Sequence, residues 1–560
     1  MSVTSSSHPQ TTPHRKHVRW IDIREGFTGC LFILPAFAII GLFGLFPIGF
    51  AVYVSMHRWR ITQGRFLGLD NYVKSLDNLA YVIFFWLVAI LLYLVARNLT
   101  KTIKNARQHG DNLWIWLLPA VVTTAGIGQF LVFFVRLLPE ILSIPEKMKG
   151  QVRTQELFMQ YLGEAWRVPE VQSALWISIL LLAVAQGLAY LVNRYLSKSP
   201  IGTSYYTSLI SVLILAASAL LLGWYTWSEI QRAYTEAFEA GEQLEIWAQV
   251  ITISAGFLLL LLSWQFWRSA PRQTSNVQLI LRMVAAIMLI IGAWILVGEL
   301  PRVIAAGDKD WWEGLQVTAY YSIGTVPLQL GISLVLATLL FQKIRGKSLY
   351  RLIFFLPYIT PAVAAAAVFR VFFSSRPSAP VNGLMGLFGL EPLRWLDEPQ
   401  GILTLIFGAN TSIPDWAVGP SLALIVIIIY NIWSYVGYDT VIFLAGLGGI
   451  PSELYEAAAI DGAGRWAQFR NITLPLLSPT TYFLTLLAVI GTFKAFNHVW
   501  VMRTGAALGT TDTASIVIFT EFNRNTQYGY AASLSFVLLG VILLLTIINN
   551  RIAEERVFYG

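Results

Sequence analysis

The chain is dominated by long, continuous apolar runs separated by short polar stretches. A helix needs roughly 20 largely apolar residues to cross a bilayer, and by that measure about twelve runs qualify. They lie near residues 30–54, 79–96, 113–135, 175–192, 209–227, 247–266, 279–297, 317–341, 352–373, 422–447, 482–501 and 532–548. A membrane barrel would instead show short segments that alternate in polarity. The pattern therefore predicts an all-α fold, a polytopic transmembrane helix bundle.

The charges between these runs predict how the helices are oriented. Loops on the cytoplasmic side carry an excess of Lys and Arg. The loops after the second and eighth runs are basic, with Arg97, Lys101, Lys104, Arg107, Lys343, Arg345, Lys347 and Arg351, whereas the loop after the fifth is rich in Glu. The basic loop 57–78 is the one exception. We expect the polar segment 1–27 to be a cytoplasmic tail, and both termini to lie inside a cell (inner) membrane that the chain crosses many times.

Composition narrows the possible classes of function. Charged residues make up 12% of the chain, about half the 25% typical of soluble domains. The net charge of +8 is accounted for by cytoplasmic loops, so membrane lipid is expected around the chain and nucleic acid is not an expected partner.

Motifs for catalysis are missing from the sequence. A phosphate-binding loop has the pattern G-x-x-x-x-G-K-[ST], and Gly346-Lys347-Ser348 matches only its last positions because residue 341 is Phe. The sequence also shows no metal-type cluster of His and Cys and no nucleophile with a matching base. We therefore expect no enzyme, no catalytic residues, and no metal or cofactor bound by this chain.

The segment 451–475 is the most informative stretch of the sequence. Pro451 and Glu453 suit the first turn of a helix, and the alanines at 457–459 favour helix and give a smooth face. Gly462 should interrupt this helix, and a second amphipathic helix is expected from 465 to 472, ended by Pro475. On these features alone, the segment is either a docking element for another protein or a connecting helix that lies on the bilayer.

The same segment resembles a known family. Glu456-Ala457-Ala458, Gly462 and Ile472-Thr473-Leu474-Pro475 are similar to the cytoplasmic EAA motif of binding-protein-dependent ABC importer permeases. The resemblance is strongest to the sugar branch, and within it to the maltose-type inner-membrane subunit. FLGLDNY at 66–72, RLIFFLPYITP at 351–361 and QYGYAASLS at 527–535 also resemble the family, so that the resemblance covers about 28–77 and 309–560.

The resemblance implies a transmembrane permease subunit that translocates a carbohydrate-like solute. Its expected partners are a cytoplasmic ABC ATPase dimer that holds ATP and Mg, a second permease subunit and an external solute-binding protein. The residues expected to couple it to the ATPase are Glu453, Glu456, Ala457, Ala458, Asp461, Gly462, Arg465, Phe469 and Pro475.

The resemblance also divides the chain into parts. After the tail at 1–27, residues 28–77 form the first core span and its outer loop, and residues 309–560 form the permease core with the coupling loop 451–475. Between them, 78–308 is an inserted bundle of about six extra spans, for which the family has no counterpart.

Polar side chains within the tenth and eleventh runs are candidates for contact with the solute, because polar groups are costly inside a membrane. Amides and hydroxyls can bond the hydroxyls of a sugar, and aromatic rings pack against its apolar faces. Helical spacing places Asn431, Ser434 and Tyr435 on one face. With the family resemblance, the expected solute-binding residues are Asn431, Ser434, Tyr435, Tyr438, Asn497 and His498. The alternative role for these groups is hydrogen bonding between helices.

A second function class fits part of the pattern. A self-contained secondary transporter commonly has about twelve spans and a carboxylate at mid-membrane, for which Asp439 is the candidate. Such a transporter needs neither an ATPase nor the loop 451–475, so the two hypotheses differ in the need for that loop.

Overall fold

The computed structural model describes residues 20–60, 62–152, 154–196, 202–241, 244–270, 275–342, 344–408 and 418–556. The expected cytoplasmic tail lies largely outside these residues, as does Lys343. Within the described residues the chain is almost entirely helical, which confirms the all-α expectation.

The elements fall into three stretches of the chain. The first contains α1 (Trp20–Ile40), α2 (Phe46–Ser55), β1 (His57–Trp59), β2 (Gln63–Phe66) and α3 (Asp70–Leu76). The second contains α4 (Leu79–Gln108), α5 (Leu117–Leu142), α6 (Ile144–Lys147), α7 (Gln155–Arg167), α8 (Pro169–Leu191), α9 (Gly202–Ala240), α10 (Ile246–Ser269) and α11 (Ser275–Ala306). The third contains α12 (Lys309–Phe341), α13 (Lys347–Ile359), α14 (Ala362–Phe372), α15 (Pro380–Leu387), α16 (Ile402–Phe407), α17 (Leu422–Gly448), α18 (Ser452–Ile460), α19 (Arg465–Gln468), α20 (Leu474–Leu476), α21 (Ser478–Phe493), α22 (Asn497–Met502), α23 (Ala514–Asn523) and α24 (Tyr528–Arg556).

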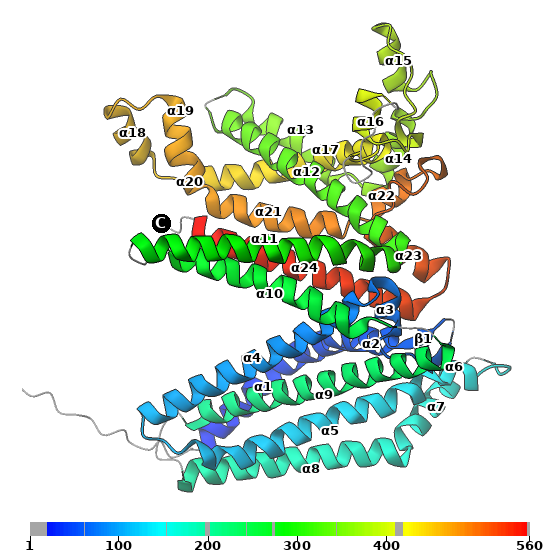
Figure 1. The fold of residues 1–560 in the computed structure, drawn as a ribbon, viewed down its shortest axis with the longest axis vertical. Coiled ribbons are helices and arrows are strands. Elements are labelled where there is room, and N and C mark those ends of the chain that lie inside the picture. Colours follow the sequence, from blue (N-terminus) through cyan, green and yellow to red (C-terminus); the bar gives the residue numbers. More distant parts are fainter. Residues whose placement is uncertain are drawn as a thin grey trace, which may run out of the picture.

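The long helices run side by side and are stacked along the long axis of the molecule (Figure 1). Helices α4, α5, α8 and α9 form one end of the stack, α10, α11 and α24 lie in the middle, and α12, α13 and α17 lie toward the other end. The segment α18–α19 projects on one side of the stack, and α15 projects on the opposite side.

Ten helices of the described part are long and apolar enough to cross a membrane, and two bent helix pairs bring the number to twelve. This agrees with the number of spans expected from the apolar runs. Helix α17 is the most enclosed of them, because 67% of its most apolar stretch is buried, compared with 17% for α4. It therefore forms the centre of the third stretch, packed against α12 and α13.

Two of the expected continuous spans are wrong in detail. The run 352–373 is broken into α13 and α14, which meet at 93°. The break falls at Thr360–Pro361, where the residue before a proline is extended because the proline ring disfavours helix there. The run 482–501 is also not one helix, because α21 ends at Phe493 and a separate short helix, α22, begins at Asn497.

A small antiparallel hairpin of β1 and β2 follows the first span, with His57 opposite Phe66. The sequence analysis did not expect these strands. The hairpin packs against the last helix, since β1 contacts α24. The beginning and end of the chain are thereby joined.

The stretch 78–308 begins and ends next to the same part of the expected permease core. The backbone N–H of Asp308 donates to the carbonyl oxygen of Ser75 over 3.4 Å. The hydroxyl of Tyr530, on α24, donates to Asp308 Oδ2 over 2.6 Å. The two ends of the stretch 78–308 therefore lie side by side, although about 230 residues separate them along the chain.

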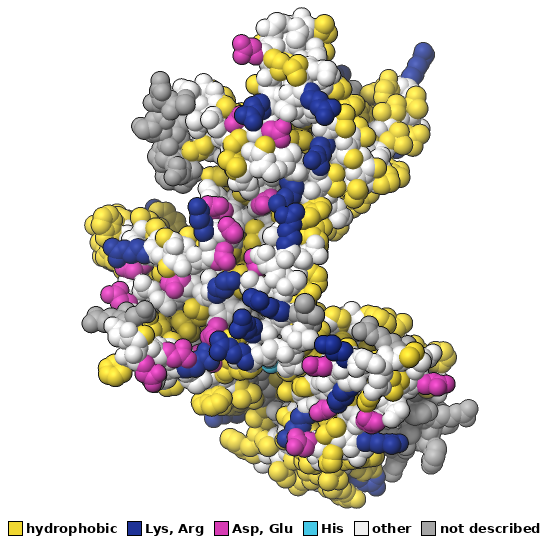
Figure 2. Space-filling view, turned by 90° about the vertical axis from the view of Figure 1, so that its right-hand side faces the viewer, with side chains coloured by type: hydrophobic (Ala, Val, Ile, Leu, Met, Phe, Trp, Pro, Cys, Tyr) yellow, Lys and Arg dark blue, Asp and Glu magenta, His cyan; other side chains and the backbone are white. Residues whose placement is uncertain are grey.

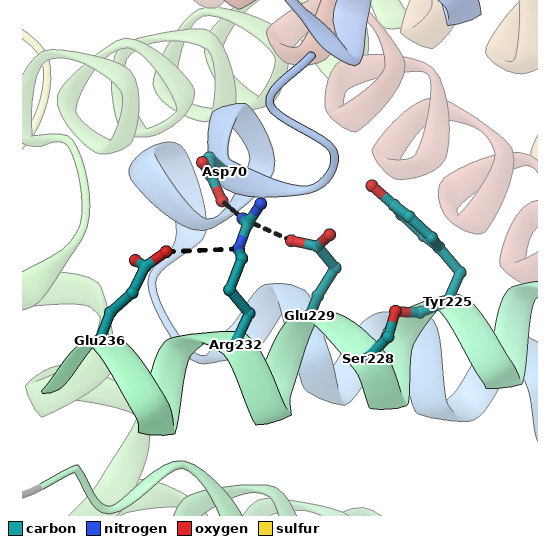
Figure 3. A network of polar contacts seen from close by, with 6 residues as sticks. All are labelled: Asp70, Tyr225, Ser228, Glu229, Arg232 and Glu236. Carbon is teal, nitrogen blue, oxygen red and sulfur yellow. Dashed lines mark hydrogen bonds and ion pairs between the residues drawn. The ribbon is translucent and has the colours of Figure 1, made fainter. Parts of the chain in front are cut away.

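An ion-pair network joins α9 to α3 (Figure 3). Arg232 Nη2 lies 2.5 Å from Asp70 Oδ1 and 2.6 Å from Glu229 Oε2, and Arg232 Nε lies 3.7 Å from Glu236 Oε1. Burial raises the pKa of the Asp70 carboxyl above its ordinary value, and the Arg232 guanidinium opposes this rise. The network connects the extra helices to the segment that follows the first span.

The side of the stack opposite α18 carries charges of both signs. Figure 2 looks onto this side, and Lys and Arg side chains are interspersed with Asp and Glu along its length. Hydrophobic side chains gather toward its edges. This distribution fits a surface in contact with water that is flanked by helices in contact with lipid.

Candidate functional site

The segment 451–475 forms a helical hairpin at one side of the stack (Figure 1). Helix α18 ends at Ile460, and Gly462 follows with a φ of +80°. The backbone N–H of Ala463 donates to the carbonyl oxygen of Ala458 over 2.8 Å, as in a left-handed helix C-terminus. The expected break at Gly462 is thus present, and it reverses the chain toward α19.

Contacts inside the hairpin fix its two arms to each other. The hydroxyls of Tyr455 and Thr473 lie 3.0 Å apart, and Gln468 Nε2 donates to the carbonyl oxygen of Ala463 over 3.1 Å. Two large apolar side chains stay outside these contacts, since Ile460 is 87% exposed and Trp466 is 72% exposed. Apolar side chains at a projecting tip are typical of an interaction surface.

The structure places the expected coupling residues on this hairpin. Glu453, Glu456, Ala457, Asp461, Gly462 and Arg465 are exposed, and Ala458, Phe469 and Pro475 are partly buried. The expectation that Pro475 ends the second helix is wrong, because the helix continues to Leu476 and then bends by 62° into α21. A π-helical turn at Phe469–Thr473 comes just before the proline, and such a widened turn accommodates a residue that lacks an N–H donor.

A cavity of about 220 Å³ lies between α12, α17 and the break that separates α21 from α22. Its lining mixes polar and apolar side chains in a part of the bundle that is otherwise apolar. The polar and aromatic residues that line it are Gln329, Asn431, Tyr435, Tyr438, Asp439, Thr492, Lys494, Phe496, Asn497 and His498. An opening of this kind can accept a polar solute between helices.

Hydrogen bonds order one wall of the cavity. Asn431 Nδ2 donates to Gln329 Oε1 over 3.1 Å, and Gln329 Nε2 donates to Asp439 Oδ2 over 2.6 Å. All three side chains are buried, so the chain of bonds satisfies polar groups that would otherwise be costly in this environment. The wall combines amide donors and acceptors with a carboxylate acceptor.

Tyr435, Tyr438 and His498 line the cavity, and Tyr358 and Tyr321 pack against them from outside it. The rings of Tyr358 and Tyr438 are stacked with centroids 4.5 Å apart, and Tyr435 lies edge-on to Tyr358 at 5.6 Å. On another wall, His498 Nε2 and the hydroxyl of Tyr321 lie 2.7 Å apart. Rings beside amide groups are the combination that carbohydrate recognition uses.

Asn497 differs from the other polar groups of the cavity. It is the first residue of α22 and is exposed toward the opening. Its side chain makes no hydrogen bond to any of the described residues. It is therefore available to a solute without breaking a bond between helices.

The structure brings together all of the expected solute-binding residues except Ser434. That residue is buried in α17 and does not line the cavity. Gln329 and Tyr358 were missed by the sequence analysis, which considered polar groups in the tenth and eleventh runs only. A glutamine inside the apolar run of α12 was a signal that could have been used.

Comparisons with known proteins agree with these features. A family described as the binding-protein-dependent transport system inner membrane component matches residues 329–556, which include most of the cavity and the whole hairpin. The probable ABC transporter permease protein YesP of Bacillus subtilis (strain 168) is 32% identical over 256 residues, which are 45% of this chain and 75% of that protein.

Two further relatives are transport permeases. The lactose transport system permease protein LacF of Rhizobium radiobacter is 31% identical over 255 residues, covering 44% of this chain and 78% of LacF. The trehalose/maltose transport system permease protein MalF of Thermococcus litoralis is 27% identical over 255 residues, covering 46% of this chain and 78% of MalF. These similarities favour the permease hypothesis over a self-contained secondary transporter.

Proposed function

This chain belongs to the family of binding-protein-dependent transport system inner membrane components, and from that premise we propose that it is the permease subunit of an ATP-driven importer for a carbohydrate-like solute. It is a multi-pass inner-membrane protein. A cytoplasmic ABC ATPase dimer supplies the energy, a second permease subunit completes the pathway, and an external binding protein delivers the solute. The chain itself carries out no hydrolysis.

One observation carries the choice of solute: the cavity between α12, α17 and α22. Its amides, carboxylate and tyrosine rings are suited to a neutral solute with many hydroxyls. The names of LacF and MalF support the same class, since they specify lactose and trehalose or maltose. Gln329, Asn431 and Asn497 would bond the hydroxyls, and Tyr438, supported by Tyr358, would pack against an apolar face of the sugar ring.

The hairpin at 451–475 is the proposed contact with the ATPase. It projects from the bundle, presents Ile460 and Trp466 to the surroundings, and is continuous with α21 through the bend at Leu477. Helix α21 ends at the cavity, since Thr492 and Lys494 line it. A push on the hairpin would therefore be transmitted along α21 to the solute site, as in a rigid-body transition. In this proposal the hairpin at 451–475 faces the cytoplasm, and both termini are expected on the same side.

The proposed solute site is tested by uptake measurements on single variants. Removing one partner of a buried hydrogen bond costs about 1–3 kcal/mol, which corresponds to roughly a five- to hundred-fold loss of affinity. We expect Asn497→Ala to raise the solute concentration needed for half-maximal uptake by that factor. Because Asn497 has no partner among the described residues, its loss should leave the thermal stability of the solute-free protein unchanged.

Two further variants separate solute binding from helix packing. Asn431→Ala removes the bond to Gln329 as well as a solute contact, so it should lower both affinity and stability. Ser434→Ala is the matched control, since Ser434 is on the same helix but does not line the cavity. Normal uptake by Asn497→Ala at low solute concentration would place the solute elsewhere.

A further inference from the structure

A polar groove lies between the end of α4 and the beginning of α9, far from the solute cavity. It has a volume of about 550 Å³. Every lining residue is polar: Asn98, Lys101, Thr102, Asn105, His109, Ser204, Tyr205, Thr207, Ser208 and Ser211. Polar groups at a membrane-spanning helix pair are costly unless they have a partner, so this concentration of hydroxyls and amides requires an explanation.

Packing on the side away from the opening holds the groove in shape. Thr102 and Tyr205 are buried, and Tyr205 donates its hydroxyl hydrogen to Asp111 Oδ2 over 3.1 Å. Behind them, the buried ring of Trp116 lies 5.9 Å from that of Tyr206. The rim residues, among them Lys101 and Asn105, are exposed. The groove is thus a formed recess with an open side, whose floor is fixed by α5 and α9.

The charge around the groove is positive. Lys101 lines it and Arg97 lies one turn earlier on α4, whereas Lys104 and Arg107 line a separate recess on another face of that helix. None of these four cations forms an ion pair with another of the described residues. No carboxylate lines the groove, and the nearby Asp111 accepts a hydrogen bond from Tyr205. A set of ammonium, hydroxyl and amide donors without a carboxylate is suited to an anion with several oxygen acceptors, and a phosphate group has that chemistry.

The groove continues into an apolar strip along the same faces of the two helices. On α9, Ile214 lies three residues after Ser211 and Leu221 lies seven residues further, and both are exposed. On α4, the exposed Leu87 lies eleven residues before Asn98, which is three helical turns. A ligand with a phosphate in the groove could therefore extend apolar chains along α4 and α9 toward the middle of the membrane.

The position of the groove agrees with the membrane surface. It lies at the end of α4, on the side of the stack from which α18 and α19 project (Figure 1). Trp114, at the start of the next span, is 75% exposed at this level, and Trp is enriched where the hydrocarbon meets the headgroups. Basic recesses between spans on the cytoplasmic side are suited to acidic headgroups.

We propose that the groove between α4 and α9 binds the phosphate group of an anionic phospholipid. The lipid belongs to the leaflet on the side from which α18 and α19 project. Lys101, Asn105 and the hydroxyl of Ser208, which is central among the groove serines of α9, bond the phosphate oxygens. The acyl chains lie along Leu87, Ile214 and Leu221. This site belongs to the extra helices and is independent of the solute cavity.

The test uses the full-length chain, delipidated in detergent, and native mass spectrometry with defined probes. Phosphatidylglycerol should bind, whereas phosphatidylcholine, which has no net charge, should bind more weakly. One Lys near a membrane surface contributes about 1 kcal/mol to the attraction of an acidic lipid, or roughly five-fold in affinity. Lys101→Gln should therefore weaken phosphatidylglycerol binding by about that factor. Lys347→Gln, at the first residue of α13 and outside the groove, is the matched control and should change nothing.

A second variant and a second probe keep the proposal open to refutation. Asn105→Ala changes an exposed rim residue, so it should leave folding intact and still weaken lipid binding. Equal binding of phosphatidylcholine and phosphatidylglycerol, or unchanged binding in both variants, would overturn the proposal. Inorganic phosphate is the remaining probe. If it binds alone with the affinity of the lipid and displaces it, the ligand is a free phosphate and the lipid assignment is wrong.

Discussion

At Gly437 the backbones of α13 and α17 approach each other closely. A Cβ atom added there would overlap the carbonyl oxygen of Phe354 and would lie 3.0 Å from the backbone nitrogen of Phe355, whereas ordinary contact begins at 3.4 Å. Both neighbours are backbone atoms of α13, so no side-chain rotation can make room. We predict that Gly437→Ala forces the two helices apart.

The expected cost follows from this geometry. Inserting one carbon atom into a well-packed site costs about 1–3 kcal/mol, and the overlap with a backbone atom favours the upper part of that range. The displacement also moves Tyr358, which follows Phe354 by one helical turn and stacks on Tyr438. The variant should therefore lose thermal stability by about that amount, and the concentration for half-maximal uptake should rise because the tyrosine pair at the cavity is displaced.

The assay compares Gly437→Ala with Gly331→Ala in uptake and in thermal unfolding of the purified chain. Gly331 is also inside a long helix, but an added Cβ there meets no atom within 4 Å. Gly331→Ala should be neutral or should stabilise the helix by about 0.5–1 kcal/mol. If Gly437→Ala has normal stability and normal uptake at low solute concentration, the close crossing does not position the aromatic wall, and the reasoning fails.

Three further predictions concern other parts of the chain. Gly462→Pro should leave the chain inserted but abolish its binding to the ATPase in co-purification, because proline cannot adopt the φ of +80°. Gly464→Ala, at a φ of −70°, is the control. Normal transport by Gly462→Pro would disprove the coupling role. Arg232→Met should lower the unfolding temperature of the purified chain, because it leaves the buried Glu229 without its cation. Arg302→Met removes a more exposed ion pair and should leave the unfolding temperature unchanged. Equal effects of the two substitutions would argue against a stabilising role of the Arg232 network. Joining residue 77 to residue 309 by a short linker, without 78–308, should preserve some ATP-dependent uptake, since the two ends of this stretch already lie side by side. Insertion and ATPase assembly without uptake would contradict this.

The apolar runs were sufficient to predict the helices, because a membrane span depends on length and hydrophobicity along the chain. The broken spans were harder to predict. The run 352–373 is apolar except at a few positions such as Thr360 and Arg370, so its hydropathy does not indicate a break, and Pro361 is the residue at which α13 and α14 separate. The break between α21 and α22 begins at Lys494, but a polar residue inside a span can equally mark a solute contact, so the sequence pattern did not identify a break there.

The solute cavity was predictable in part, for a geometric reason. Relative to Asn431, a helix places Tyr435 about 40° to one side and Asp439 about 80° to the same side, whereas Ser434 lies about 60° to the other side. Which of these directions faces the cavity depends on how α12 packs against α17. That packing also brings in Gln329, 102 residues before Asn431, and a sequence pattern within one helix cannot report such a partner.

The contact between the first span and the last helix has a consequence for how the protein is made. Ser533, on α24, donates to the carbonyl oxygen of Asn71 across 462 residues of chain. At about 5–20 residues per second, a ribosome needs roughly 25 to 90 s to synthesise that interval. During this time α2 and the β1–β2 hairpin lack their contact partner α24. The helices α4 to α11, by contrast, contact helices that are synthesised shortly before or after them. The helices at 78–308 are therefore expected to assemble first during biosynthesis, and the permease core to close only when the C-terminal helix leaves the ribosome.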